Sequence, residues 1–381
     1  MKKNNLYIYI DQPFANQQME MVFPKKFKNP KFNLKFLSTQ NISFTKDEIR
    51  NYYKSTPSNE IPKNVIYLNS QNEFENYVKK IKSEDLVFLR ERSINEIKFN
   101  NFDLKLFKKY KIKTIWFDYD PWFKSNLSKS TFLNTLRHIR VATRKLILSM
   151  KKYDYEPNYY VGFGTETKKN FIKMGFKKTK YLDCPSIWIK SSKKKPRIKN
   201  FIVYVDENLF FSRDQFLFDK KMKKISNVNT FLKDINLFFN ILEKKYKTKV
   251  IISCSKKYTY DKNYFEGRKI IYGKTLDLIS RSKAVVGHSS DALFQAIYSN
   301  KPTILLKHKT FNVKKNFFVN FKSINLFDKY ANYLEDYLKN KKKINISINK
   351  KYYKSILTKY FISKKFKLKN FYENFSKQIL Q

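Results

Sequence analysis

The turn from Gly287 to Ser290, with the sequence Gly-His-Ser-Ser, holds residue types suited to binding a phosphate-bearing ligand. It follows the apolar run 284–286, a predicted strand, and opens the amphipathic run 290–299, a predicted helix. In an open α/β sheet, ligands bind beyond the carboxyl ends of the strands, in the loops that enter the helices. The spacing therefore places this turn where a ligand is expected.

Each residue of the turn has a chemical use. Gly287 permits the close approach of a ligand or of backbone, and Ser289 and Ser290 offer hydroxyls beside the unpaired N–H groups of a helix start. His288 can bond a phosphate or give a proton to a leaving group. The alternative is a simple helix start, since serine is a favoured N-cap and Asp291 suits the helix dipole without a ligand.

Carboxylates that could act as a general base follow three predicted strands. Asp118 and Asp120 follow the run 114–117, Asp11 follows the first apolar run, and Asp206 begins the segment after another. The alternative is that these acids cap helices or pair with nearby lysines. Asp118 and Asp120 also match a D-x-D pattern, which in some transferases holds a divalent metal. Three residues are weak evidence for that, and we expect no metal site.

The remaining chemistry-bearing residues are few. His138 and His308 are isolated in the sequence and are interpreted as structural. Cys184 and Cys254 are the only cysteines; neither has a histidine partner in sequence, so neither thiol catalysis nor a disulfide framework is indicated.

The formal net charge of +48 comes almost wholly from lysine, since only 10 of the 80 basic residues are arginine. Arginine is the residue that reads phosphates and bases by paired contacts, so nucleic acid is not the expected partner. A basic surface instead favours anionic substrates or an anionic membrane. No apolar run reaches the length of a membrane span, and the start is a poor signal peptide, so we expect a cytoplasmic protein.

Short apolar runs alternate with segments of helical spacing along the chain, which predicts an α/β fold with largely parallel sheets. The predicted strands are 6–10, 65–68, 86–89, 114–117, 159–163, 180–183, 201–205, 249–253, 269–272, 284–286 and 303–306. The predicted helices are 130–150, 230–246, 275–282 and 290–299.

The polar, lysine-rich stretch 189–200 breaks this rhythm and predicts a linker. We therefore expect two Rossmann-like domains, an N-terminal one over 1–188 and a C-terminal one over 201–345. The tail 346–381 repeats apolar residues at helical spacing between lysines, which predicts amphipathic helices. These helices either pack back on the body or lie on a membrane surface.

Two segments of the predicted second domain carry a resemblance to a known family. The segment 264–306 contains, in order, Gly-Arg, Gly-Lys-Thr with a leucine-rich helix, His-Ser-Ser before a helix, and Lys-Pro before a strand. This order resembles the donor-binding half of GT-B glycosyltransferases that build bacterial surface polysaccharides, and 201–214 resembles the segment that opens the same domain. Two Rossmann-like domains joined by one linker are also the architecture of GT-B enzymes.

The resemblance implies site residues for the donor. Ser289 and Ser290 would bind the donor phosphate beside Gly287 and His288, and Lys274 and Thr275 would line the same site.

One departure bears on the donor nucleotide. Relatives that use CMP-activated sugars carry His-Pro after the strand equivalent to 249–253, whereas this chain has Cys254 and Ser255 there, with Lys256 next as a replacement charge. A CMP donor is therefore in doubt, and to a lesser degree so is catalytic competence.

The implied function is a glycosyltransferase that moves a sugar from a nucleotide-sugar donor onto a surface polysaccharide, capsule or lipopolysaccharide acceptor. The GT-B pattern favours Asp118 or Asp120 of the first domain as the base and implies no cofactor and no obligatory metal. The expected partners are the donor, a glycan or lipid-linked acceptor, and an anionic inner-membrane surface touched peripherally. The alternatives are a GT-B-like polyol-phosphate transferase, an epimerase, or a non-catalytic basic binding protein.

Overall fold

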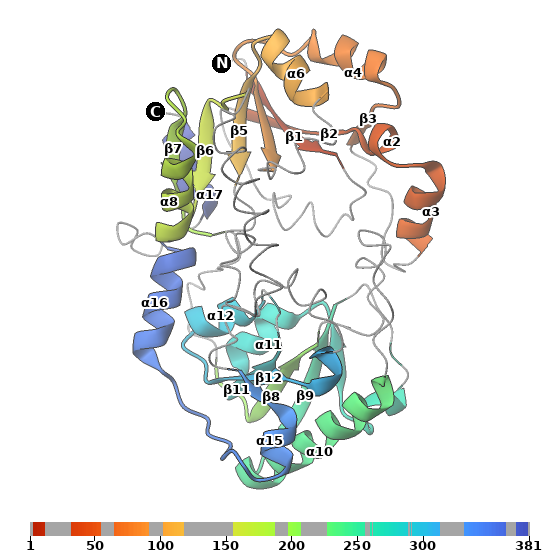
Figure 1. Cartoon of the computed structure of the whole chain (residues 1–381), viewed down its shortest axis with the longest axis vertical. Coiled ribbons are helices and arrows are strands. Elements are labelled where there is room, and N and C mark those ends of the chain that lie inside the picture. The colour runs from red at the N-terminus through yellow and green to blue at the C-terminus, as the bar shows by residue number, and fades with distance from the viewer. Residues whose placement is uncertain are drawn as a thin grey trace, which may run out of the picture.

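The structure is a computed structural model, and it has two bodies, one above the other in Figure 1. It describes residues 3–11, 32–54, 65–90, 102–117, 155–186, 197–206, 227–255, 260, 262–288, 290, 292–312, 331–362 and 371–379. The expected linker, 189–200, and the expected helix 130–150 lie mostly or wholly outside these residues.

The first body, at the top of Figure 1, contains a seven-stranded sheet in the order β3-β2-β1-β4-β5-β6-β7, and every strand pair in it is parallel. The strands are β1 Asn4–Ile10, β2 Phe32–Ser38, β3 Val65–Tyr67, β4 Leu86–Arg90, β5 Lys113–Phe117, β6 Tyr159–Gly162 and β7 Lys180–Asp183. The helices are α2 Gln40–Ser43, α3 Lys46–Lys54, α4 Gln71–Val78, α6 Phe102–Lys109 and α8 Gly164–Met174.

The second body, at the bottom of Figure 1, contains a six-stranded sheet in the order β10-β9-β8-β11-β12-β13, again with parallel pairs. The strands are β8 Phe201–Val205, β9 Lys249–Cys254, β10 Ile270–Tyr272, β11 Ala284–Gly287, β12 Thr303–Lys307 and β13 Asn332–Tyr333. Its helices are α10 Val228–Tyr246, α11 Thr275–Arg281, α12 Ala292–Tyr298 and α15 Leu334–Leu338, with short 3₁₀ turns at Lys262–Phe265 and Lys309–Asn312. The two parallel sheets confirm the predicted α/β class.

Both sheets are buried on two faces, which explains why their strands have nearly continuous apolar sequences. All five residues of β8 are buried, for example, and so are the four of β11. The buried side chains form four groups, one on each face of each sheet. The fold is therefore doubly wound, and its loops are left at the strand ends.

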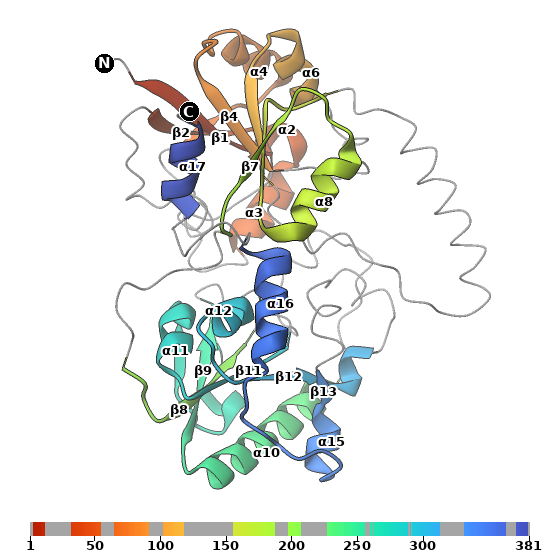
Figure 2. The ribbon, with the colours of Figure 1, turned by 90° about the vertical axis from the view of Figure 1, so that its left-hand side faces the viewer.

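The tail connects the two bodies (Figure 2). Helix α16, Lys350–Tyr360, buries Tyr353 and Ile356 in the core of the second body, whereas α17, Phe371–Ile379, buries Phe371 and Phe375 in the core of the first. These contacts agree with the interpretation of the tail as helices packed on the body.

The junction between α16 and the first body is tight. A Cβ atom at Gly164 would lie 2.7 Å from the carbonyl oxygen of Thr358, and Gly164 has a φ of +62°, a conformation that other residues adopt with strain. Nearby, the Ser186 N–H donates a 2.8 Å hydrogen bond to the carbonyl of Phe361. Glycine at the start of α8 therefore allows the two chain segments to touch.

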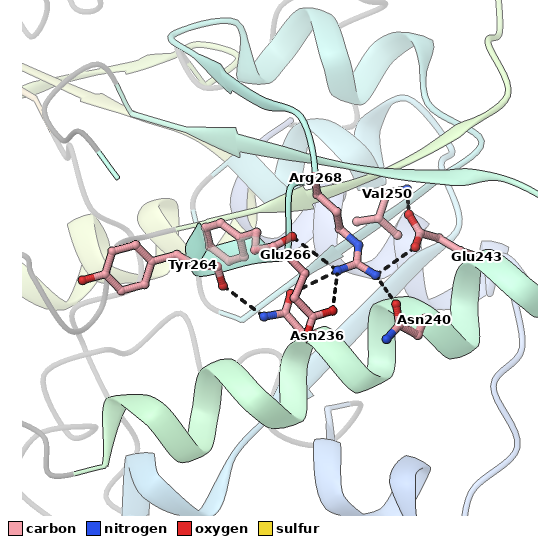
Figure 3. Close-up of polar contacts among 8 residues, drawn as sticks. Asn236, Asn240, Glu243, Val250, Tyr264, Glu266 and Arg268 are labelled. Atoms are coloured by element: carbon pink, nitrogen blue, oxygen red, sulfur yellow. Dashed lines mark hydrogen bonds and ion pairs between the residues drawn. The ribbon is translucent and has the colours of Figure 1, made fainter. Parts of the chain in front are cut away.

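A buried arginine holds the long helix α10 against the sheet of the second body (Figure 3). The Arg268 guanidinium, whose side chain is only 8% exposed, donates to Glu243 at 2.8 Å and to the side-chain oxygens of Asn236 and Asn240. Glu243 in turn accepts a 2.8 Å hydrogen bond from the N–H of Val250 at the start of β9.

Candidate functional site

The strand order of the second sheet reverses between β8 and β11. Strands β8, β9 and β10 run outward in one direction, and β11, β12 and β13 run outward in the other. In doubly wound sheets, ligands bind in the crevice at such a reversal, beyond the carboxyl ends of the strands. Asp206 follows β8 there, and His288 follows β11. The predicted turn thus lies at the position that topology favours.

His288 is fully buried in this position and engaged on both sides of its ring. Its Nδ1 lies 3.0 Å from the Leu306 carbonyl, and its Nε2 lies 3.0 Å from the Tyr204 hydroxyl. A carbonyl only accepts, so Nδ1 carries the hydrogen and Nε2 accepts from Tyr204. Burial lowers the pKa of His288 to about 4, so the ring is neutral at pH 7.

This lowered pKa predicts a pH dependence of stability. An unfolded histidine takes up a proton near pH 6.5 but the folded one does so only near pH 4, so the folded state loses stability as the pH falls through this window. The expected loss from this residue is about 2 kcal/mol at pH 5 relative to pH 7. Denaturant unfolding of the wild type and of His288→Gln at both pH values measures it. An equal pH dependence in the two proteins would contradict it.

Asp206 is held by two donors from neighbouring segments. The Tyr260 hydroxyl donates to its carboxylate at 2.6 Å, and the Cys254 thiol lies 3.8 Å from the same oxygen. Burial, followed by the charge of Asp206, raises the pKa of both Tyr260 and Cys254 well above their usual range, so both stay protonated. Cys254, which stands where some relatives have histidine, is therefore a donor to Asp206.

The next strand ends contribute hydroxyls. The Ser253 Oγ donates a 2.8 Å hydrogen bond to the Thr275 Oγ1 at the start of α11, and the preceding Lys274 is exposed. Thr275 and Lys274 thus lie at the same carboxyl edge as His288, and their contact with a donor stays a prediction.

Gly287 and Ser290 have local structural uses in this edge. A Cβ at Gly287 would come within 2.8 Å of a Leu293 methyl group, so the glycine lets α12 pack close to β11. The Ser290 hydroxyl accepts from the N–H of Ala292 at 3.3 Å, as a helix-starting serine does. Ser290 therefore serves as a cap in this structure, and its phosphate contact stays a prediction.

Several predicted site residues lie outside the described residues. These are Ser289 and Lys256 of the donor site and the candidate bases Asp118 and Asp120 of the first body. Asp118 would follow β5, whereas the first sheet reverses its strand order between β1 and β4. By the topological rule, Asp11, which directly follows β1, is thus the better-placed acid among the described residues.

Two of the four resemblance motifs lie at the opposite, amino edge of the sheet. Arg268 of Gly-Arg binds Glu243 beside the start of β9. Lys301 of Lys-Pro is buried before β12, and its ammonium donates to the Ser282 carbonyl at 2.8 Å. Burial lowers the pKa of Lys301. These motifs hold the domain together, while the Gly-Lys-Thr and His-Ser-Ser motifs lie at the carboxyl edge.

Sequence reasoning missed the tyrosines of this edge. Tyr204 lies in the middle of an apolar strand and is 1% exposed, so its type and place indicate only a core residue. Tyr260 lies 54 residues from the Asp206 to which it donates. No local sequence pattern indicates that either tyrosine hydroxyl forms a hydrogen bond at this edge, because the partners, Asp206 and His288, come from distant segments.

Comparisons with known proteins give only distant likenesses. No protein-family model matches the sequence, and no curated protein matches it. Solved structures that align with the chain include UGT2 of Phytolacca americana complexed with UDP-2fluoro-glucose and pterostilbene, at 7% identity, 94% of this chain, 90% of that chain and a TM-score of 0.45. A UDP-glucosyltransferase from Polygonum tinctorium aligns at 7% identity, 87% and 85% coverage and a TM-score of 0.46.

The UDP-GlcNAc 2-epimerase of Methanocaldococcus jannaschii, in complex with UDP-GlcNAc and UDP, aligns at 14% identity, over 93% of this chain and 98% of that one, with a TM-score of 0.38. Among the described helices, none has the length and apolar character needed to cross a bilayer.

Proposed function

We propose that this chain is a glycosyltransferase that moves a sugar from a nucleotide-sugar onto a surface polysaccharide or lipopolysaccharide acceptor. The observation that carries the proposal is the position of the Gly-His-Ser-Ser turn. The turn belongs to the segment whose sequence resembles a donor-binding half. It begins at the end of β11, beside the strand-order reversal of the second sheet, where ligands bind in doubly wound folds. Motif and topology are independent, and both favour the same edge.

In this proposal, the donor phosphates lie against the turn at Gly287–Ser290, with Lys274, Thr275 and Lys256 around them. The lysines and hydroxyls stabilise the charge that develops on the leaving nucleotide, so no cofactor is needed and no metal is required there. His288 is neutral and hydrogen-bonded to Tyr204 of β8 and Leu306 of β12. In this proposal it links the ends of these strands until a ligand displaces one of the two bonds.

The acceptor lies against the first body, and a carboxylate of that body takes the proton of its hydroxyl. The resemblance to GT-B enzymes favours Asp118 and Asp120 as the proposed bases, and Asp11, at the strand-order reversal of the first sheet, is the alternative. We also propose a peripheral contact with anionic lipid, supported by the net charge of +48 and by Ile172, which is 66% exposed beside Lys169 and Lys173 on α8.

The first test is a thermal-shift screen of the full chain with CMP, CDP, UDP, GDP and dTDP. A nucleotide at a hundredfold excess over its dissociation constant should stabilise the protein by about 2.7 kcal/mol. The variant Ser290→Ala/Thr275→Val should lose this stabilisation, because it removes two hydroxyls from the carboxyl edge. The matched control is Thr248→Val, which removes a buried hydroxyl at the amino edge, before β9, and should bind normally.

The products decide between the chemistries. A transferase releases free nucleotide only when an acceptor glycan is present, whereas an epimerase isomerises the nucleotide-sugar without releasing nucleotide. Polyol-phosphate transfer would require a nucleotide-polyol donor. If no nucleotide stabilises the wild type at millimolar concentration, with or without Mg²⁺, the turn is a helix start and the non-catalytic alternative replaces this proposal.

A further inference from the structure

His308 is not isolated, as its place in the sequence led us to expect. It directly follows β12, and the structure brings it together with Asp234 of α10 and Glu335 of α15. His308 and Asp234 are 74 residues apart in the chain. Among the described residues, these three side chains form the group with metal-ligand chemistry, and it lies at the carboxyl edge of the second sheet, beyond β12, the strand next to β11.

The spacing of the three side chains suits one small cation. The His308 Nε2 lies 3.1 Å from the Asp234 Oδ2 and 3.6 Å from the Glu335 Oε1, and the three ligand atoms lie within 4.8 Å of one another. A zinc ion bonds nitrogen and oxygen ligands at about 2.0–2.2 Å, so two ligands at tetrahedral angles are about 3.3 Å apart. Both distances to the imidazole nitrogen are close to that value.

The electrostatics of the group also call for a cation. The His308 side chain is 1% exposed and those of Asp234 and Glu335 are 20% and 13% exposed, so two carboxylates approach each other largely out of water. The Glu335 Oε1 accepts one hydrogen bond, from the Lys309 N–H at 2.9 Å. Its Oε2 is buried and has no hydrogen-bond partner among the described residues. A buried carboxylate oxygen without a partner is costly, and a bound cation would remove that cost.

Thr310 can determine which ring nitrogen of His308 carries the hydrogen, and so whether Nε2 is available as a metal ligand. Its hydroxyl lies 2.6 Å from the His308 Nδ1, and its N–H also faces that nitrogen at 3.2 Å. When the hydroxyl accepts a hydrogen bond from the Nδ1–H, Nε2 presents its lone pair to the two carboxylates. When the N–H donates to Nδ1 instead, Nε2 carries the hydrogen and donates to Asp234. Cation binding selects the first tautomer, as the hydrogen bonds behind metal-bound histidines commonly do.

We propose that Asp234, His308 and Glu335 bind one divalent transition-metal cation, with Zn²⁺ the best fit. One imidazole and two carboxylates give it three protein ligands and leave a fourth position for water. The cation joins α10, the segment after β12 and the start of α15, and it neutralises the two carboxylates. The nitrogen ligand disfavours Mg²⁺ and Ca²⁺, which prefer oxygen ligands throughout. This proposal does not depend on the proposed transferase activity.

The test is a titration of the full chain, stripped with a chelator and dialysed, with Zn²⁺ alone against a competing colorimetric chelator. One Zn²⁺ per chain is expected, with a rise in melting temperature that Mg²⁺ at the same concentration does not produce. The isosteric variant Asp234→Asn/Glu335→Gln should bind Zn²⁺ at least about a hundredfold more weakly. Thr310→Val, which keeps all three ligands, should weaken binding about 10- to 100-fold.

The matched control is Asp277→Asn, which removes a half-exposed carboxylate paired with Arg281 on α11 and should leave Zn²⁺ binding unchanged. Circular dichroism checks that each variant is folded. The proposal is overturned if the wild type shows no one-to-one binding below about 100 μM, or if the folded double variant binds Zn²⁺ as tightly as the wild type does. In that case the group is an Asp–His hydrogen bond only. No nucleotide enters the experiment, so its outcome is separate from that of the nucleotide screen.

Discussion

Replacing Arg268 with alanine is expected to destabilise the second domain by about 3–5 kcal/mol, the cost of breaking a buried ion pair by removing one partner. A loss of this size would lower the melting temperature of that domain by about 10 °C. The side chain is 8% exposed, yet it carries a charge, so its partners must satisfy it within the protein.

The expected loss has several sources at once (Figure 3). Glu243 would lose its 2.8 Å partner while it still accepts from the Val250 N–H, and Asn236 would lose the donor to its side-chain oxygen. The guanidinium also lies 5.3 Å from the ring centre of Phe239, so a cation–π contact disappears. Asn236 would keep only the hydrogen bond that it donates to the Tyr264 carbonyl. The bonds that the Arg268 guanidinium makes to α10 are therefore lost together.

Arg281→Ala provides the matched control. Arg281 also pairs with a carboxylate, Asp277 at 3.0 Å, but the two side chains are 44% and 49% exposed, so the expected cost is below about 0.5 kcal/mol. Calorimetry gives the melting temperatures, and hydrogen exchange in α10 assigns the loss to the second domain. Equal effects of Arg268→Ala and Arg281→Ala would show that burial of the network contributes nothing.

The second large effect is expected in the tail. Phe371→Ala with Phe375→Ala should destabilise the first domain by more than about 5 kcal/mol, since truncating one buried phenylalanine typically costs about 3–5 kcal/mol. Both rings are 2% exposed. Phe371 lies 5.6 Å from the ring of Phe117, and Phe375 lies 5.7 Å from that of Phe88, with the two stacked on each other at 5.4 Å. The double truncation would open a cavity over β4 and β5.

Lys377→Ala is the control in the same helix, because Lys377 is exposed and its loss should change stability by less than about 0.5 kcal/mol. The measurement is amide hydrogen exchange in β4, β5 and β6, whose protection should fall in the double phenylalanine variant only. Unchanged protection in those strands would mean that α17 adds nothing to the first domain's core, against the contacts described above.

The fold was largely predictable because most strands are buried on both faces. Continuous apolar runs such as 201–205 and 284–286 appear as strands within a residue of the predicted bounds. Strand β2, Phe32–Ser38, was missed because partly exposed Asn33 and Lys35 interrupt its apolar residues. A search for continuous runs does not find a strand whose exposed face alternates with its buried one.

The position of the candidate site was predictable only where one short segment holds its residues, and the ligand role of those residues stays a prediction. The turn at 287–290 combines glycine, histidine and serine within four positions, and its described residues Gly287, His288 and Ser290 lie beside the strand-order reversal. Asp234 and His308, by contrast, approach only because α10 packs against the segment that follows β12. A contact between distant segments has no period or spacing in the sequence, so it must be read from the topology.

The route of the tail has a consequence for how the protein is made. The Gln378 side chain donates to the Asp183 carbonyl at 2.7 Å, a contact between residues 195 positions apart. The core of the first domain is therefore complete only after α17 has been synthesised. A ribosome adds about 5–20 residues per second, so this domain emerges first and stays incomplete for roughly ten seconds or more while the second domain is synthesised. During that time Phe88 and Phe117 lack their contacts with Phe375 and Phe371. We expect a chaperone that binds exposed apolar side chains to bind the nascent chain there.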